Sequence, residues 1–204
     1  MKILSLTLAS LTTFSFGLFH PILADSHGHF PGTGSVDAYN RSCLCGDKAI
    51  EYSHKGDNSM AIKYDREAVS IYPYDSAHYY NLGDHLSKLD KTAEAINAFE
   101  QAVTLEPRYL NAWLNLGLSY LNEGKLSEAE RCYRKAVELN PVCWEALGNL
   151  GDALRQQGKF AEAGECIYKA KALPTRTSGE AVNADDRAQL DDILKKCNSK
   201  DRSP

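Results

Sequence analysis

Apolar residues recur three and four positions apart through most of this chain, the spacing that places side chains on one face of an α-helix. The clearest two faces are formed by Trp113, Leu116, Gly117 and Tyr120, and then by Ala129, Tyr133, Ala136 and Val137. Gly124 lies between these faces and Pro141 follows the second. Glycine tolerates the left-handed conformation that ends a helix, and proline stops one, so the pattern predicts a helical hairpin.

The same pattern returns every 34 residues. Four residue series share this step and one phase: Pro73, Pro107 and Pro141; Gly83, Gly117 and Gly151; Ala61, Ala95, Ala129 and Ala163; and Ala68, Ala102, Ala136 and Ala170. A repeated hairpin cannot bury its apolar face alone, but it can bury that face against its neighbours. The period therefore predicts an all-α solenoid of stacked hairpins.

Within one period, Trp113 is followed by Leu116-Gly117, and then by Tyr120 and Ala129. An aromatic residue, an alanine and a closing proline complete the unit, at Tyr133, Ala136 and Pro141. This order resembles the tetratricopeptide repeat (TPR) family, which implies a superhelical solenoid that binds proteins. The resemblance is strong over 76–109 and 110–143, good over 144–174 and weak over 42–75, where Asp65 stands in place of the second aromatic residue.

The chain begins differently, with Lys2, a run of apolar residues, Pro21 and then Ala24. This order is typical of a secretory signal peptide, so we interpret 1–24 as one that is cleaved after Ala24. The alternative is a retained membrane anchor. Residues 25–41 are rich in Gly, Ser, Asp, His and Pro and are expected to form a flexible leader. The mature protein is then expected outside the cytoplasm, in the periplasm or secreted, and not inserted in a membrane.

The C-terminal part predicts one more helix after a polar linker at 175–183. Over 184–197 the apolar residues Leu190, Ile193 and Leu194 share a face. TPR arrays often end in a helix that covers the last hairpin, and we expect this role here. Residues 198–204 are expected to fray.

Composition narrows the function further. The 204 residues carry a net charge of −4 at pH 7, and we find no basic stripe along the sequence, which argues against nucleic-acid binding. His54, His78 and His85 are scattered, no Ser or Cys has a base at motif spacing, and we find no phosphate loop. We therefore expect neither enzymatic activity nor a cofactor.

Six cysteines in an exported chain raise the question of disulfides. Cys132 and Cys166 are one repeat apart on neighbouring helices, which lie beyond the reach of a disulfide. Cys166 and Cys197 form the best candidate bridge, because the last helix should lie against the last hairpin. Cys43 and Cys45 have no second ligand pair nearby.

The resemblance to the TPR family also implies a binding groove. In that family an asparagine two residues before the repeated glycine faces the concave side, and its carboxamide can pair with the backbone of an extended peptide. We expect the groove to be lined by Tyr80, Asn81, Asp84, Leu114, Asn115, Leu118, Glu145, Asn149 and Asp152. An apolar centre flanked by carboxylates suggests a peptide with hydrophobic anchors, accompanied by Lys or Arg residues that the carboxylates would attract. The Lys and Arg residues of chaperone-binding TPRs are absent from these positions.

The sequence thus predicts an exported, non-enzymatic scaffold or assembly adaptor that binds a protein or an extended peptide. One alternative is an extracytoplasmic Cu(II)- or Ni(II)-binding protein. Cleavage after Ala24 would leave Asp25, Ser26 and His27 at the N-terminus, where four nitrogens can surround a metal in a plane. A secreted effector is another alternative. Neither the partner nor the oligomeric state follows from the sequence.

Overall fold

A computed structural model of the chain describes residues 36–173 and 184–200, and each element in these two ranges is an α-helix. In chain order the helices are α1 (Val36–His54), α2 (Asn58–Ile71), α3 (Ser76–Ser87), α4 (Thr92–Leu105), α5 (Leu110–Asn122), α6 (Leu126–Leu139), α7 (Trp144–Gln156), α8 (Phe160–Ala172) and α9 (Ala184–Lys200). The expected all-α architecture of helical repeats is therefore confirmed.

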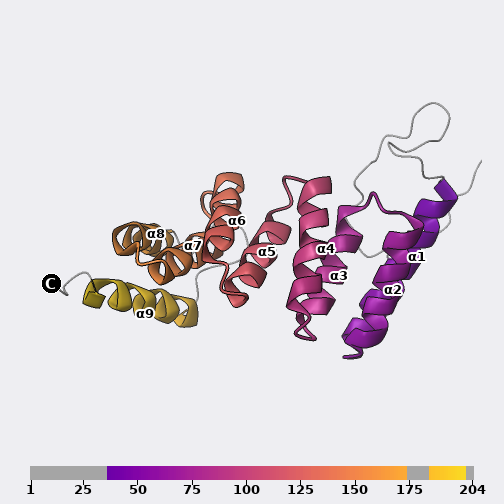
Figure 1. The fold of residues 1–204 in the computed structure, drawn as a ribbon, viewed down its shortest axis with the longest axis horizontal. Coiled ribbons are helices and arrows are strands. Elements are labelled where there is room, and N and C mark those ends of the chain that lie inside the picture. Colours follow the sequence, from indigo (N-terminus) through magenta and orange to yellow (C-terminus); the bar gives the residue numbers. More distant parts are fainter. Residues whose placement is uncertain (1–35, 174–183, 201–204) are drawn as a thin grey trace, which may run out of the picture.

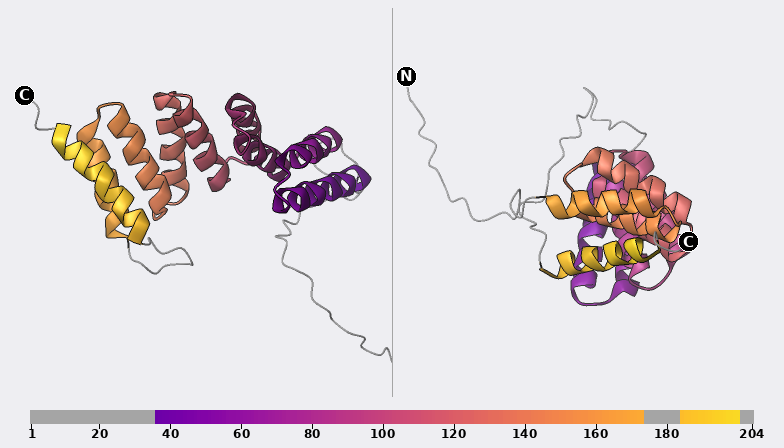
Figure 2. Two further views of the ribbon diagram at one scale, coloured as in Figure 1. Left: turned by 90° about the horizontal axis from the view of Figure 1, so that it is seen from below. Right: turned by 90° about the vertical axis from the view of Figure 1, so that its left-hand side faces the viewer.

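The first eight of these helices pair into four hairpins: α1 with α2, α3 with α4, α5 with α6, and α7 with α8. The hairpins stack along the long axis of the molecule, and each packs against the next (Figure 1). The last helix, α9, lies at the C-terminal end of the stack (Figure 2). It packs against α8 and, to a lesser extent, against α7, so it takes the place that the first helix of another hairpin would occupy.

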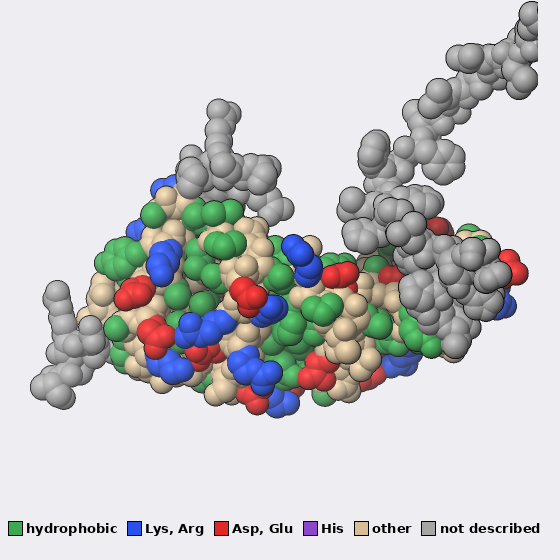
Figure 3. Space-filling view, turned by 90° about the horizontal axis from the view of Figure 1, so that it is seen from above, with side chains coloured by type: hydrophobic (Ala, Val, Ile, Leu, Met, Phe, Trp, Pro, Cys, Tyr) green, Lys and Arg blue, Asp and Glu red, His purple; other side chains and the backbone are tan. Residues whose placement is uncertain are grey.

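The surface carries both signs of charge, interspersed among hydrophobic side chains on the face shown in Figure 3. Some of these charges join neighbouring hairpins. Arg66 on α2 donates to Glu94 on α4, and Arg134 on α6 donates to Glu162 on α8 across 2.8 Å. Both pairs span 28 residues, so each connects the second helices of two adjacent hairpins.

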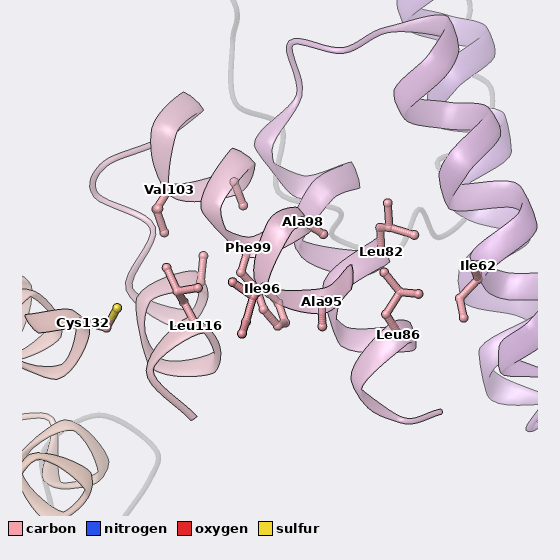
Figure 4. Close-up of a cluster of buried hydrophobic side chains, with 12 residues drawn as sticks. Ile62, Leu82, Leu86, Ala95, Ile96, Ala98, Phe99, Val103, Leu116 and Cys132 are labelled. Atoms are coloured by element: carbon pink, nitrogen blue, oxygen red, sulfur yellow. The ribbon is translucent and has the colours of Figure 1, made fainter. Parts of the chain in front are cut away.

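The core of each hairpin depends on a glycine that admits a large side chain from the partner helix. A Cβ atom at Gly83 would lie 2.6 Å from the ring of Phe99, and one at Gly117 would lie 2.7 Å from the ring of Tyr133. Gly151 has the same relation to Ile167. Phe99 belongs to a buried cluster that extends from Ile62 on α2 through α3, α4 and α5 to Cys132 on α6 (Figure 4).

The first hairpin solves this packing problem differently. Ala49 stands at the phase of Gly83, and Asp65 stands at the phase of Phe99. Both residues are fully buried. Because a carboxyl group is smaller than an aromatic ring, the helix opposite it can carry alanine instead of glycine.

The turns within the hairpins need a residue with positive φ. Gly56, Gly124 and Gly158 supply it at φ values of 78°, 72° and 81°. Asp90 stands at the same phase and adopts φ 57°, a conformation that costs a side-chain-bearing residue more than glycine.

Two expected boundaries shift in the structure. Residues 36–41, expected to belong to the flexible leader, form the first turns of α1, where Tyr39 packs edge-on against Tyr72 at a centroid distance of 5.3 Å. Helix α9 continues past 197 to Lys200. The signal segment at 1–24, the leader up to residue 35, the linker from 174 to 183 and the tail from 201 lie outside the described residues.

No helix within 36–173 or 184–200 combines the length and apolar character needed to cross a bilayer.

Candidate functional site

A cavity of about 290 Å³ lies where α5, α7 and α9 face one another. Five of its lining residues are among those expected in the groove: Leu114, Asn115, Leu118, Glu145 and Asn149. Leu118 is 47% exposed, whereas Leu114 is buried at its base. The cavity therefore combines two apolar side chains on α5 with two carboxamides, Asn115 on α5 and Asn149 on α7, which are one repeat apart.

The three asparagines at the groove phase do not have equal positions. Asn115 and Asn149 line the cavity, but Asn81 does not. Asn81 is half-buried on α3, one hairpin towards the N-terminus. The structure therefore brings two of the three expected carboxamides to one cavity.

Tyr80, which was also expected in the groove, does not line the cavity and packs against a core cluster instead. Its ring lies 4.9 Å from that of Tyr109 and 5.9 Å from that of Phe99, measured between centroids. The side-chain amide of Asn115 donates to the Tyr80 hydroxyl across 3.3 Å. This bond connects α3 to α5 and fixes the orientation of the Asn115 carboxamide.

Two of the three carboxylates expected to flank the groove, Asp84 and Asp152, are paired with side chains three or four residues further along the chain. Asp84 accepts from Lys88 at 2.8 Å. Asp152 accepts from Arg155 at 2.6 Å and from Gln156 at 2.8 Å. Neither aspartate lines the cavity. Lys88 and Arg155 already neutralise these two aspartates, so the aspartates are less able to attract basic residues of a partner than the sequence suggested.

Half of the cavity comes from residues that the sequence did not identify as a site: Trp144, Gly148, Gln189, Leu190 and Ile193. A Cβ atom at Gly148 would lie 3.1 Å from a methyl group of Leu190, so glycine lets α9 approach α7 closely. Gly148 has the phase of Tyr80 and Leu114, and this loss of a large side chain is the one sequence feature that could have indicated the contact.

Two histidines that looked scattered in the sequence are buried between the first two hairpins. His78 Nε2 lies 3.2 Å from Ser42 Oγ, and the nearest carboxylate oxygen, on Asp75, is 3.9 Å from that same nitrogen. A catalytic triad needs its acid at the other ring nitrogen, so this group lacks the geometry of one. The Ser42 hydroxyl donates to the Tyr39 carbonyl across 2.7 Å.

His85 pairs with the buried Asp65, with 2.6 Å between Nδ1 and Oδ2. Burial raises the pKa of Asp65 above its ordinary value, although His85 opposes this shift. The second oxygen of Asp65, Oδ1, is buried without a hydrogen-bond partner. Both residues are closed off from solvent, which suits a structural pair rather than an acid–base catalyst.

All six cysteines lie in the described residues as free thiols, so the expected bridge between Cys166 and Cys197 is not formed in the structure. Both side chains contribute to one core cluster. Their surroundings differ, however. Burial raises the pKa of both thiols. Lys169 and Arg134 oppose this shift at Cys166, whereas Arg155 opposes it at Cys197.

No group of three or more His, Cys, Asp or Glu side chains in the described part of the chain could hold a metal ion. The proposed copper or nickel ligands Asp25, Ser26 and His27 lie outside that part.

Comparison with known proteins agrees with the repeat geometry. The tetratricopeptide repeat family profile matches residues 80–130 and 114–176. Among curated proteins no match to the sequence is found.

Several solved structures have the same fold. A crystal structure of MamA protein is 27% identical over 64% of this chain and 72% of its own, with a TM-score of 0.62. A MamA RS-1 ArsTM double mutant is 19% identical and covers 80% of this chain and 96% of its own, with a TM-score of 0.63.

The first TPR of Spaghetti (RPAP3), solved with the HSP90 peptide SRMEEVD bound, is 24% identical. It covers 59% of this chain and 95% of its own, with a TM-score of 0.57. At this level of identity the likeness concerns the fold.

Proposed function

Because the chain belongs to the tetratricopeptide-repeat family, we propose that it is a protein-interaction module that holds an extended peptide in the cavity between α5, α7 and α9. The observation that carries the proposal is the combination of Asn115 and Asn149 with Leu114 and Leu118 on one wall. Each carboxamide offers a donor and an acceptor to one peptide unit, and the leucines offer a site for an apolar side chain.

The cavity favours a particular kind of peptide. Glu145 is the charged residue in its lining, which contains neither lysine nor arginine. A terminal carboxylate would thus meet no cation there, unlike in the chaperone-binding TPRs. We propose an internal segment of the partner, with a Leu-, Met- or Phe-like anchor between Leu118 and Ile193.

We also propose that the protein works outside the cytoplasm as a scaffold or assembly adaptor. The support is the order of Lys2, the apolar run, Pro21 and Ala24. The intact mass of the protein purified from its native host tests this part. A mass that starts at Asp25 supports export, and a mass that includes residues 1–24 contradicts cleavage.

A crosslinking experiment tests the groove. A photo-reactive amino acid placed at position 118 should capture the partner, because the Leu118 side chain is exposed at the cavity. Position 168 is the control, since Tyr168 is 59% exposed on α8 and does not line the cavity. A protein captured at 118 and not at 168, whose binding Leu118→Glu then abolishes, supports the proposal. Equal capture at both positions contradicts it.

A further inference from the structure

A second hollow, of about 300 Å³, lies between α2 and the turn that joins α3 to α4. Its lining consists of Ser59, Ile62, Lys63, Arg66, Leu89 and Lys91. None of these residues lines the cavity between α5, α7 and α9. It is therefore a separate feature of the first two hairpins.

Three of the lining residues carry positive charge in a chain whose net charge is −4. Glu94 pairs with Arg66, and it lies 3.8 Å from Lys91. Lys63 makes no ion pair among the described residues; its ammonium lies 5.9 Å from the centre of the Tyr64 ring. Two of the three cations, Arg66 and Lys91, thus share one carboxylate, while Lys63 has none among the described residues.

The repeat provides an internal comparison. The residues two repeats further along the chain from those of this hollow lie on α6 and in the turn between α7 and α8. Arg66 maps onto Arg134, and Lys91 maps onto Lys159. Glu94 maps onto Glu162, and both arginines pair with the corresponding glutamate. The two places therefore keep an arginine, a lysine and the glutamate that pairs with the arginine at matching positions.

At the later place the cations converge on a carboxylate of the chain itself. Glu130 accepts from Arg134 at 2.8 Å, from Lys159 at 2.8 Å and from the amide of Gln157 at 2.9 Å. Partial burial acts to raise the pKa of Glu130, but the hydrogen bonds from Lys159, Arg134 and Gln157 outweigh it and lower the pKa to about 2. This cation arrangement is thus a working carboxylate receptor in the same molecule.

At the first place that carboxylate is missing. Ile62 stands at the phase of Glu130, and Leu89 stands at the phase of Gln157. Ile62 is buried at the base of the hollow, and Leu89 is 37% exposed at its rim. The cations are retained, but the residue at the centre of the receptor is apolar and leaves space.

We propose that this hollow binds a glutamate or aspartate side chain from an acidic peptide of a partner protein, in the position that Glu130 fills from within the chain at the later place. Arg66 and Lys91 receive the carboxylate, and Lys63 adds positive charge beside it. Ile62 and Leu89 contact the aliphatic part of the ligand. The protein then has two peptide sites, an apolar one at the C-terminal end and an acid-binding one at the N-terminal end.

The test uses two blocked peptides, acetyl-Glu-Glu-Leu-Glu-amide and acetyl-Gln-Gln-Leu-Gln-amide, titrated into the full chain while backbone amide shifts are followed by NMR. We expect the glutamate peptide to shift the amides around Lys63 and Lys91, and the glutamine peptide to leave them unmoved. The effect should weaken with added salt, because the charges are exposed.

Three variants decide the assignment. Lys63→Glu and Lys91→Ala should each weaken the glutamate peptide by at least about tenfold. Lys125→Ala is the matched control, since Lys125 has the phase of Lys91 one hairpin along, and it should bind as the parent does. Equal shifts from the glutamine peptide, or unchanged affinity in Lys63→Glu, would overturn the proposal. The proposal would also be overturned if inorganic phosphate shifted the amides around Lys63 and Lys91 and the glutamate peptide did not.

Discussion

Tyr133 has a side chain that is fully buried and a hydroxyl group without a hydrogen-bond partner. Burial is the largest of the effects that raise the pKa of this hydroxyl. Phe99 and Ile167 fill the same slot in the neighbouring hairpins without a polar atom. The Tyr133 ring therefore supplies the packing that Gly117 requires, while its hydroxyl adds a desolvation cost.

Removing that hydroxyl should stabilise the protein. We predict that Tyr133→Phe raises the free energy of unfolding by about 1 kcal/mol. Folding of the variant no longer has to remove a hydroxyl group from water without giving it a hydrogen bond in return. Urea unfolding followed by circular dichroism measures the change. Tyr133→Ala is the contrasting variant, which should lose about 3–5 kcal/mol by leaving a cavity. A destabilised Tyr133→Phe protein would mean that the hydroxyl has a partner after all.

Asp90 offers a second test at this scale. It holds φ 57° at a turn position where the other three hairpins have glycine. Asp90→Gly should stabilise the protein by about 0.5–1 kcal/mol, since glycine adopts this conformation without steric cost. The reciprocal variant Gly124→Asp should lose a similar amount. Thermal melts measure both variants. An Asp90→Gly protein that melts below the parent, or a Gly124→Asp protein that melts above it, would contradict this account of the turn.

Among the elements, the junction of the first hairpin with α3 differs from every later one because it buries Asp65 with His85. The same positions in the next hairpin hold Phe99 and Ser119, with Gly83 in place of Ala49. The raised pKa of Asp65 means that folding favours its protonated form, so ionisation above that pKa costs stability.

Copying the next hairpin should remove this cost. We predict that Ala49→Gly, Asp65→Phe and His85→Ser together raise stability by about 1–4 kcal/mol, because a packed aromatic ring replaces a buried carboxyl group and its partner. A serine at this phase can bond to its own helix, as Ser119 does to the Asn115 carbonyl. His85→Ala alone should cost about 3–5 kcal/mol, because it leaves Asp65 buried without its partner. Denaturant unfolding of the triple and single variants distinguishes the two effects. A triple variant less stable than the parent would show that the pair contributes net stability.

Glu130 predicts the opposite dependence on pH at the far end of the array. Its pKa is lowered from 4.5 to about 2 in the folded protein. A lowered pKa gives stability that is fully present above pH 4.5 and is lost as pH falls towards 2. We expect a contribution of about 1–2 kcal/mol, since Arg134 and Lys159 are partly exposed. Unfolding of the parent and of Glu130→Gln should therefore differ at pH 7 and converge near pH 2. A constant difference across this range would refute the receptor arrangement at Glu130.

Particular residues show how far the sequence could predict these elements. Gly117 and Tyr133 repeat at a fixed spacing, so the hairpins and their order follow from the pattern alone. The contact of Leu190 with Gly148 was missed, because α9 lies outside the repeat period and the small residue at Gly148 is the one sign of it in the sequence. The Asp65–His85 pair was also missed, because each residue breaks the repeat in a different hairpin and only the stacking brings them together.

At the scale of the whole molecule, α9 closes one side of the cavity that contains part of the expected groove. The sequence placed nine residues along the concave face, and the structure brings five of them into one cavity. Helix α9 adds Gln189, Leu190 and Ile193, so the expected cap is also a wall of the site. The cavity is therefore shorter than the array, and Asn81, the first of the three asparagines, does not line it.

This asymmetry allows a direct test of the peptide-binding claim, with a peptide from the protein captured at position 118. Each lost amide pair should cost about 0.5–1.5 kcal/mol, so Asn115→Ala with Asn149→Ala should weaken binding by about 5- to 150-fold in titration calorimetry. Asn81→Ala is the matched control and should bind as the parent does. Thermal melts should confirm that all three proteins are equally folded. Undiminished affinity in the double variant, or an equal loss in Asn81→Ala, would contradict the account.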